Sequence, residues 1–100
     1  MPKTLDDFKA QFPEVWSAYE RLRNESDRKG PLDGKTIELI KIGISTAMEH
    51  EGGVVAHASQ ARKAGASDEE IYQAILTATS LCGFPAVLGA VSTAKEFLEP

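Results

Sequence analysis

The sequence predicts an all-α fold, a single-domain bundle of five to six helices, and three observations support this prediction. Strand signals are nearly absent, because no segment alternates apolar and polar residues over five or more positions. Apolar residues recur instead at helical spacing. Glycines, prolines and capping residues stand where helices are expected to begin and end.

The first long helix is predicted to begin at Pro13, because a proline suits the first helical position. Four apolar residues follow at helical spacing and form one stripe: Val15, Trp16, Tyr19 and Leu22. The polar stretch 23–34, which contains Gly30 and Pro31, is expected to end this helix. Residues 4–10 are expected to add one or two turns before it.

Residues 33–48 are predicted to form the central helix, because aliphatic side chains cover most of its circumference. These side chains are Ile37, Leu39, Ile40, Ile42, Ile44 and Met48. A third helix is expected over 53–64, with Gly65 in the position that follows a helix end.

The last two helices are expected over 67–81 and 84–98. Ser67 and Glu70 form a capping box at the start of the first, and Gly83 and Pro85 separate the two. The stretch 74–94, which covers the end of the first of these helices and most of the second, contains no charged residue over 21 positions. This is long enough to span a membrane. Because five hydroxyl residues and the Gly–Pro break interrupt this stretch, we interpret it as two helices at the protein centre or at a subunit interface.

Composition narrows the choice of partners. The net charge of −4 comes without a basic stripe, which argues against binding to nucleic acid. A chain of 100 residues forms a thin core alone, so homo-oligomer formation would stabilise it.

Two features indicate the compartment. The lone Cys82 cannot form an internal disulfide, which indicates a reducing compartment. The charged N-terminus is unlike a signal peptide. We therefore expect a cytoplasmic protein.

His57 and Glu38 are the first candidates for chemistry. His57 falls on the small, apolar face of its helix, where an imidazole is either a usable acid or base or a core histidine bonded to a carbonyl. Glu38 either pairs on the surface with Lys35 and Lys41 or points inward. If it points inward, a histidine on the next antiparallel helix is its natural partner, and such a pair can transfer protons.

His50 and Glu51 stand at a helix end, where a histidine is expected to cap the helix and interact favourably with its dipole. A metal site formed with His57 is disfavoured, because seven helical residues separate side chains by about 10 Å. Trp16 and Tyr19 either line a pocket or pack in the core.

Two segments carry a family resemblance: LDGKTIELIKIGISTA, and the later HASQARKAGASDEEIYQAILTATSLCGFPAVLGAVSTAKEF. They resemble the carboxymuconolactone decarboxylase family, which includes alkyl hydroperoxidase D. The resemblance covers about 32–98 and leaves 1–31 as an N-terminal helical extension. It implies an all-α domain that assembles as trimers or hexamers.

The peroxidase branch of that family uses a glutamate, two cysteines in a Cys-x2-Cys motif and a histidine. Aligned with this sequence, they correspond to Glu38, His50, Gly53 and His57, so both thiols are missing. Glycine cannot act as a nucleophile, and Cys82 is too far along the chain to replace one. The resemblance therefore argues against thiol peroxidase activity.

The decarboxylase branch also lacks the cysteine pair and keeps the histidine. The resemblance implies a cofactor-free acid–base enzyme, without a metal, acting on a small lactone or carboxylate, with His57 as acid or base and Glu38 as its orienting group. A basic group should hold the substrate carboxylate, and the candidates are Lys35, Lys41, Arg62 and Lys63. We take His50, Lys41 and Trp16 as the candidate binding residues.

Two alternatives remain open. The chain could be a non-enzymatic oligomeric helical protein that kept the fold and lost the chemistry, with Gly52 and Gly53 forming a close-packed helix junction. A residual redox role through His50, Cys82 or a bound metal is the third hypothesis.

Overall fold

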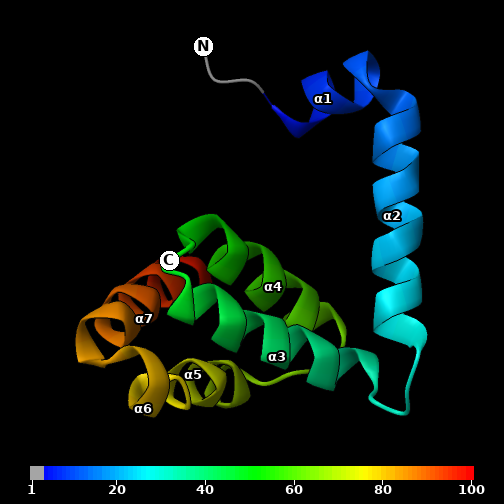
Figure 1. Ribbon diagram of the computed structural model, residues 1–100. Helices are drawn as coiled ribbons and strands as arrows, with labels where there is room; N and C mark the ends of the chain where they lie inside the picture. Colours follow the sequence, from blue (N-terminus) through cyan, green and yellow to red (C-terminus); the bar gives the residue numbers. More distant parts are fainter. Residues whose placement is uncertain (1–3) are drawn as a thin grey trace. The chain divides into compact units, whose positions relative to one another are not determined.

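The computed structural model describes residues 4–100, and every regular element in that range is a helix (Figure 1). The seven helices are α1 (Leu5–Gln11), α2 (Pro13–Arg28), α3 (Gly34–Ala47), α4 (Glu51–Lys63), α5 (Asp68–Leu76), α6 (Thr79–Cys82) and α7 (Phe84–Leu98). The all-α prediction is confirmed. The number of helices within 4–100 exceeds the predicted five to six, because the helix expected over 67–81 is divided in two.

The chain divides into two compact units between Pro31 and Leu32. In the first unit, Thr4 and Asp7 form a capping box at the start of α1, and Pro13 is the first residue of α2. Trp16 and Tyr19 lie 5.3 Å apart between ring centroids. No described residue of α1 or α2 is buried, so their apolar stripe does not form a core within this unit.

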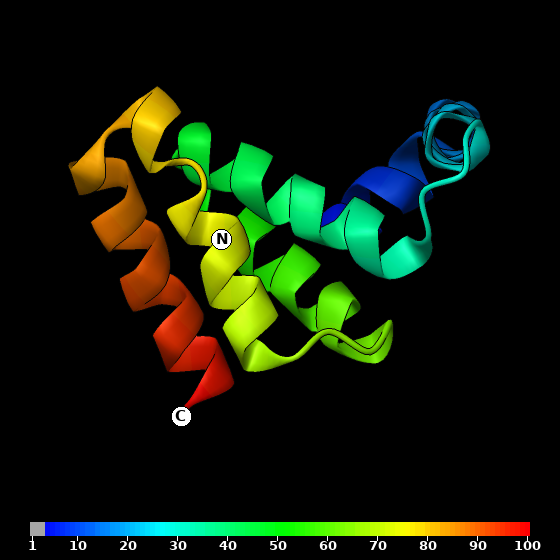
Figure 2. The same cartoon turned by 90° about the horizontal axis from the view of Figure 1, so that it is seen from below.

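The second unit has its own core. The antiparallel helices α3 and α4 pack along one another, and α5 and α7 pack against them (Figures 1 and 2). The buried side chains are aliphatic and small: Ile42, Val54, Ala58, Ala61, Ala66, Ile71, Ile75, Ala78, Val87, Ala90, Ala94 and Leu98. Alanines at these contacts allow the helices to approach closely, and Ile42, Ile71 and Ile75 fill the space between them.

The connection between α3 and α4 is tight. The His50 N–H donates to the Ser45 carbonyl and the Glu49 N–H donates to the Thr46 carbonyl, which is the Schellman pattern of a helix end. The same pattern closes α4, where Gly65 has a φ of +98°. At the α3 end, however, the left-handed position is held by Glu49, with a φ of +53°, although glycine or asparagine is the usual residue there.

Two predicted boundaries are wrong. The third helix begins at Glu51 and not at residue 53, because the side chain of His50 caps it. The helix expected over 67–81 ends at Leu76, and α6 begins at Thr79. At this break the hydroxyls of Thr77 and Thr79 each donate to the carbonyl three residues earlier, at 2.7 Å, and so compete with regular helical bonding.

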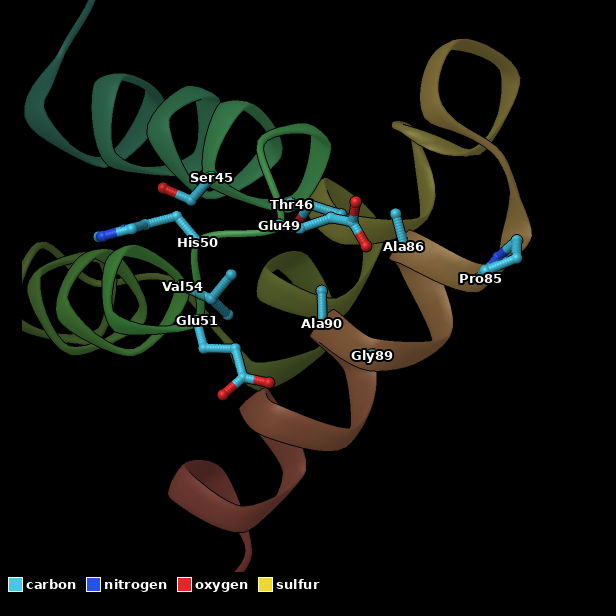
Figure 3. A pocket seen from close by; sticks show the side chains of 10 residues that line it. All are labelled: Ser45, Thr46, Glu49, His50, Glu51, Val54, Pro85, Ala86, Gly89 and Ala90. Carbon is cyan, nitrogen blue, oxygen red and sulfur yellow. The ribbon is translucent and has the colours of Figure 1, made fainter.

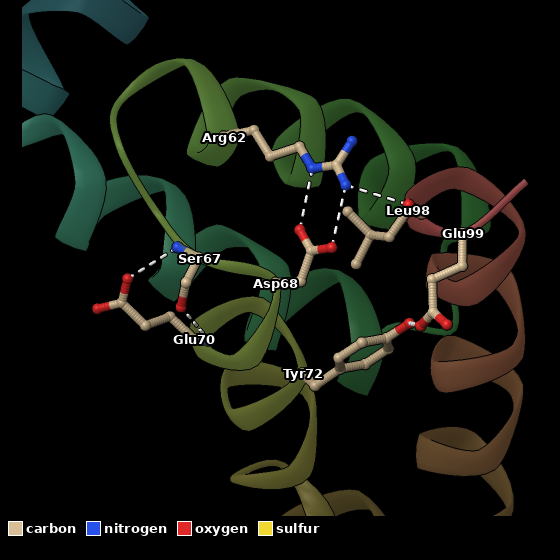
Figure 4. A network of polar contacts seen from close by, with 7 residues as sticks. All are labelled: Arg62, Ser67, Asp68, Glu70, Tyr72, Leu98 and Glu99. Atoms are coloured by element: carbon tan, nitrogen blue, oxygen red, sulfur yellow. Dashed lines mark hydrogen bonds and ion pairs between the residues drawn. The ribbon is translucent and has the colours of Figure 1, made fainter.

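Polar contacts join the ends of three helices in the second unit (Figure 4). The Arg62 guanidinium donates to both carboxylate oxygens of Asp68, each at 3.0 Å, and to the Leu98 carbonyl at 3.1 Å. The Tyr72 hydroxyl donates to Glu99 at 2.5 Å, and this bond together with burial raises the pKa of Tyr72 to about 12. These bonds hold the C-terminal end of α7 against α4 and α5.

Within the described residues, no helix combines the length and the apolar character needed to cross a membrane. The uncharged stretch 74–94 instead contributes to α5, α6 and α7.

Candidate acid–base site

The structure brings Glu38 and His57 together across the contact between α3 and α4. His57 Nδ1 lies 2.8 Å from Glu38 Oε1, which is hydrogen-bond distance. The Glu38 side chain is 20% exposed and that of His57 is 31% exposed, so both are half-buried. Glu38 therefore points inward toward the following antiparallel helix and is not part of a surface pair with Lys35.

The geometry assigns a role to each imidazole nitrogen. An ionised carboxylate can only accept hydrogen bonds, so Nδ1 of His57 carries the proton that Glu38 accepts. Nε2 is then the nitrogen that can gain or lose a proton. A histidine oriented in this way by a carboxylate is the usual arrangement of a general acid or base.

His50 caps the helix that follows it. Its Nδ1 accepts a hydrogen bond from the Gly53 N–H at 2.8 Å, so the expected capping is present. His50 stands directly before the N-terminus of α4, where a positive charge is unfavourable, and a favourable dipole interaction with the end of α3 stays a prediction. The cap requires an unprotonated Nδ1.

Gly53 is one of the most closely packed positions of the chain. A Cβ at this residue would lie 2.5 Å from Ser45 Oγ and 2.6 Å from His50 Nδ1, both inside van der Waals contact. A Cβ at the neighbouring Gly52 would meet only His50 Cε1, at 3.6 Å. Any side chain at position 53, including a cysteine, would therefore displace the His50 cap or Ser45.

The four basic residues that could hold a substrate carboxylate lie in different surroundings. Lys35 Nζ lies 3.0 Å from Glu70 Oε2, and Arg62 is held by Asp68 as described above. Hydrogen bonds from the Ser67 N–H and then from Lys35 lower the pKa of Glu70. Lys63 is exposed at the last residue of α4. Lys41 lies one helical turn after Glu38 on α3, which places both on one face of that helix.

The remaining candidates lie apart from this pair in the chain. Trp16 belongs to α2 of the N-terminal unit, where Lys9 Nζ lies 4.8 Å from its ring centroid. Cys82 is half-buried at the end of α6, and its thiol lies 3.8 Å from the Gly83 carbonyl. Across residues 4–100, no three His, Cys, Asp or Glu side chains are grouped in a way that could hold a metal ion.

A cavity of about 140 Å³ lies at the N-terminal end of α4, between the end of α3 and the start of α7. Neither Glu38 nor His57 lines it. Its walls are formed by Ser45, Thr46, Glu49, His50, Glu51, Val54, Pro85, Ala86, Gly89 and Ala90 (Figure 3). This cavity leaves no signal in the sequence, because it depends on how closely α7 approaches the α3–α4 connection.

The four-helix core and the carboxylate–histidine pair define a small helical protein with a candidate acid–base site. The family model of the carboxymuconolactone decarboxylase family matches residues 13–96. The chain belongs to this family. The match begins in α2, earlier than the resemblance at residue 32 indicated.

A solved structure is similar over nearly the whole chain. It is the apo crystal structure of a carboxymuconolactone decarboxylase family protein from Legionella pneumophila, with 27% sequence identity and a TM-score of 0.84. The similarity covers 95% of this chain and 85% of that one. A search among curated proteins gives no match.

Proposed function

We propose that the protein is a cofactor-free acid–base enzyme of the lyase type, acting on a small lactone or carboxylate. His57 is the general acid or base, and Glu38 is the positioning residue that orients it. The observation that carries this proposal is the 2.8 Å contact between His57 Nδ1 and Glu38 Oε1, because it leaves Nε2 to exchange a proton with a substrate.

In a decarboxylation, the carbon–carbon bond to the substrate carboxylate breaks, carbon dioxide leaves, and the electron pair stays on the lactone. Protonated Nε2 of His57 delivers a proton to the carbon that carries this pair, and solvent then restores the proton. Glu38 accepts the hydrogen bond from Nδ1 and so holds the imidazole ring in place during the transfer. General acid–base catalysis of this kind contributes about 10²- to 10⁴-fold to the rate.

A cationic group is needed to hold the substrate carboxylate, and we assign this role to Lys41. Lys41 shares a helical face with Glu38 and so lies on the same side of α3 as the pair.

We further propose that the protein works as a homo-oligomer, a trimer or hexamer, in the cytoplasm. Apolar side chains remain exposed on both units, among them Tyr19 and Leu22 on α2 and Ile40, Ile44 and Met48 on α3. Burying such surface in a second copy would stabilise a thin core. Sedimentation at several concentrations measures this assembly, and a monomer at all of them would refute it.

The enzymatic proposal is tested by carbon dioxide release from small lactone carboxylates. The wild-type protein is compared with His57→Gln, Glu38→Gln and Lys41→Gln, and with Glu96→Gln as a control that changes one exposed carboxylate on α7. We expect His57→Gln to lower kcat by about 10²-fold or more. Lys41→Gln should mainly raise KM. Equal turnover by the wild type and His57→Gln would refute the proposal.

A non-enzymatic oligomeric protein is the second candidate function. The close packing of Gly53 against Ser45 and His50 favours it, because this junction has a structural purpose without any chemistry. Under this function, His57→Gln changes only the stability of the protein. Turnover that is lost on substitution while the oligomer stays intact would exclude it.

A further inference from the structure

The first turn of α4 is capped by an imidazole and not by the hydroxyl, carboxylate or amide that usually caps a helix. Nδ1 of His50 accepts the hydrogen bond of the Gly53 N–H at 2.8 Å. A neutral imidazole can accept a hydrogen bond on one nitrogen, whereas an imidazolium carries a proton on both. Protonation of His50 therefore removes this cap, and rotation of the ring cannot restore it.

The place of His50 makes a positive charge unfavourable in a second way. The free N–H groups at the start of a helix carry partial positive charge, and an imidazolium would direct its own N–H toward them. His50 is exposed, so protons reach it directly from the solvent. Serine, threonine or asparagine at this position would cap the helix without titrating. The histidine thus makes the start of α4 sensitive to acid.

The connection that precedes the cap has an unfavourable backbone conformation. Glu49 has a φ of +53°, a left-handed conformation that costs a glutamate more than a glycine. Two backbone bonds hold this connection: the His50 N–H donates to the Ser45 carbonyl at 2.9 Å, and the Glu49 N–H donates to the Thr46 carbonyl at 3.0 Å. The bond from Gly53 to the imidazole is the third. Because this third bond depends on pH, acid weakens the connection at a point that is already strained.

The charged residues nearest to His50 in the chain are two carboxylates. Glu49 precedes it, Glu51 follows it, and both line the cavity together with it. Figure 3 shows their side chains extending toward α7, whereas the imidazole extends away from that helix. From α7, the cavity lining contains only uncharged residues, namely Pro85, Ala86, Gly89 and Ala90. The carboxylates therefore attract an imidazolium only from a distance and do not replace the lost bond.

Two basic groups lie further along the helices that meet at this connection. Lys41 lies about two turns before the end of α3, and His57 lies about two turns after the cap on α4. A positive charge on either opposes a proton on His50. His57 itself responds differently to acid, because its Nδ1 already donates to Glu38 and a proton on Nε2 leaves that bond in place. Of the two histidines, His50 is the one that loses its bond.

We infer that His50 is an acid-sensitive clasp of the connection between α3 and α4. Imidazoles gain a proton between pH 8 and pH 5, and over this range His50 releases the Gly53 N–H. The first turn of α4, residues 51–54, then opens more often than the rest of the helix. This opening loosens one wall of the cavity, because Glu51 and Val54 line it. The clasp belongs to the fold and does not rest on the proposed acid–base function.

Hydrogen exchange of backbone amides, followed by NMR at pH 8 and pH 5, tests the clasp in the full-length protein. Each rate is divided by the rate of an unstructured peptide at the same pH, because exchange itself depends on pH. We expect the protection of the Gly53 amide to fall by about fivefold between pH 8 and pH 5, which is the ratio that a typical helix cap supplies. The nitrogen shifts of the His50 ring should show a bare Nδ1 at pH 8.

Three variants separate the cap from the titration. His50→Asn keeps a capping oxygen that does not titrate, so Gly53 should be equally protected at pH 8 and pH 5. His50→Ala has no cap and should show low protection at both. His57→Gln is the matched control, because it removes the other titrating imidazole and should keep the fall at Gly53. Thermal melts establish that each variant is folded.

Four results would overturn the inference. These are equal protection of Gly53 at pH 8 and pH 5 in the wild type, a fall that persists in His50→Asn, a fall that disappears in His57→Gln, and a proton on Nδ1 of His50 at pH 8.

Discussion

Replacing the two neighbouring glycines of α4 by alanine should have opposite effects on stability. Gly52 and Gly53 are both helical, so alanine removes conformational freedom from the unfolded chain at either position and gains up to about 1 kcal/mol. At Gly52 the added Cβ meets one atom at 3.6 Å, an ordinary contact. Gly52→Ala should therefore stabilise the protein by about 0.5–1 kcal/mol.

At Gly53 the added Cβ would lie 2.5 Å from Ser45 Oγ and 2.6 Å from His50 Nδ1. Forcing extra atoms into packed surroundings costs about 1–3 kcal/mol, and displacing His50 removes a helix cap valued at about 1 kcal/mol. After the gain from alanine is subtracted, Gly53→Ala should destabilise the protein by about 1–3 kcal/mol.

Urea unfolding and thermal melts at one protein concentration measure both variants, because the midpoint of an oligomer depends on concentration. For a domain of this size, 1 kcal/mol shifts the melting temperature by about 4–8 °C. The double variant Ser45→Ala/Gly53→Ala should recover part of the loss. If Gly53→Ala is as stable as Gly52→Ala, the close contact at Gly53 does not exist in solution and the reasoning fails.

Three further predictions concern the fold. The Ser67 N–H is the main cause of the lowered pKa of Glu70. This shift adds stability that is fully present above pH 4.5, the ordinary pKa of a glutamate, and is lost as the pH falls through the lower pKa of the folded protein. The free energy of unfolding of Glu70→Gln should therefore fall less steeply with falling pH than that of the wild type. Identical acid unfolding curves would contradict this prediction. The raised pKa of Tyr72 adds stability below pH 10.0 that is lost as the pH rises toward about 12. Tyr72→Phe should remove the tyrosinate absorbance step near pH 12, and its persistence would mean that Tyr72 is not the group that titrates there. Ile71→Ala, at a fully buried site, should cost about 2–5 kcal/mol in urea unfolding, and a loss below about 1 kcal/mol would place Ile71 outside the core.

Parts of the candidate site could be predicted from the sequence. Glu38 and His57 fall on helices that a short connection makes antiparallel, and a carboxylate among aliphatic residues needs a polar partner. These local rules place the two residues in contact. The same reasoning identified Ser67 and Gly65 as helix boundaries, because capping chemistry depends on neighbours in the chain.

Other features depend on information that the sequence does not carry locally. The start of α4 was expected two residues late, because the residue that caps it is His50 and not one of the usual caps, serine, threonine, aspartate or asparagine. The break after Leu76 contains neither glycine nor proline and arises from two threonine hydroxyls that bond to backbone carbonyls. The acidic cavity requires α7 to lie beside the α3–α4 connection, which is a tertiary arrangement.

The most direct test of the acid–base pair is a double-mutant cycle on kcat with a lactone carboxylate that the wild-type protein decarboxylates. The single variants Glu38→Gln and His57→Gln are compared with the double variant, all with confirmed helix content and oligomeric state. Residues that act as one unit give strongly non-additive losses, so the double variant should lose little more than His57→Gln alone. Losses that multiply, or full activity in Glu38→Gln, would contradict the proposal that Glu38 acts through His57.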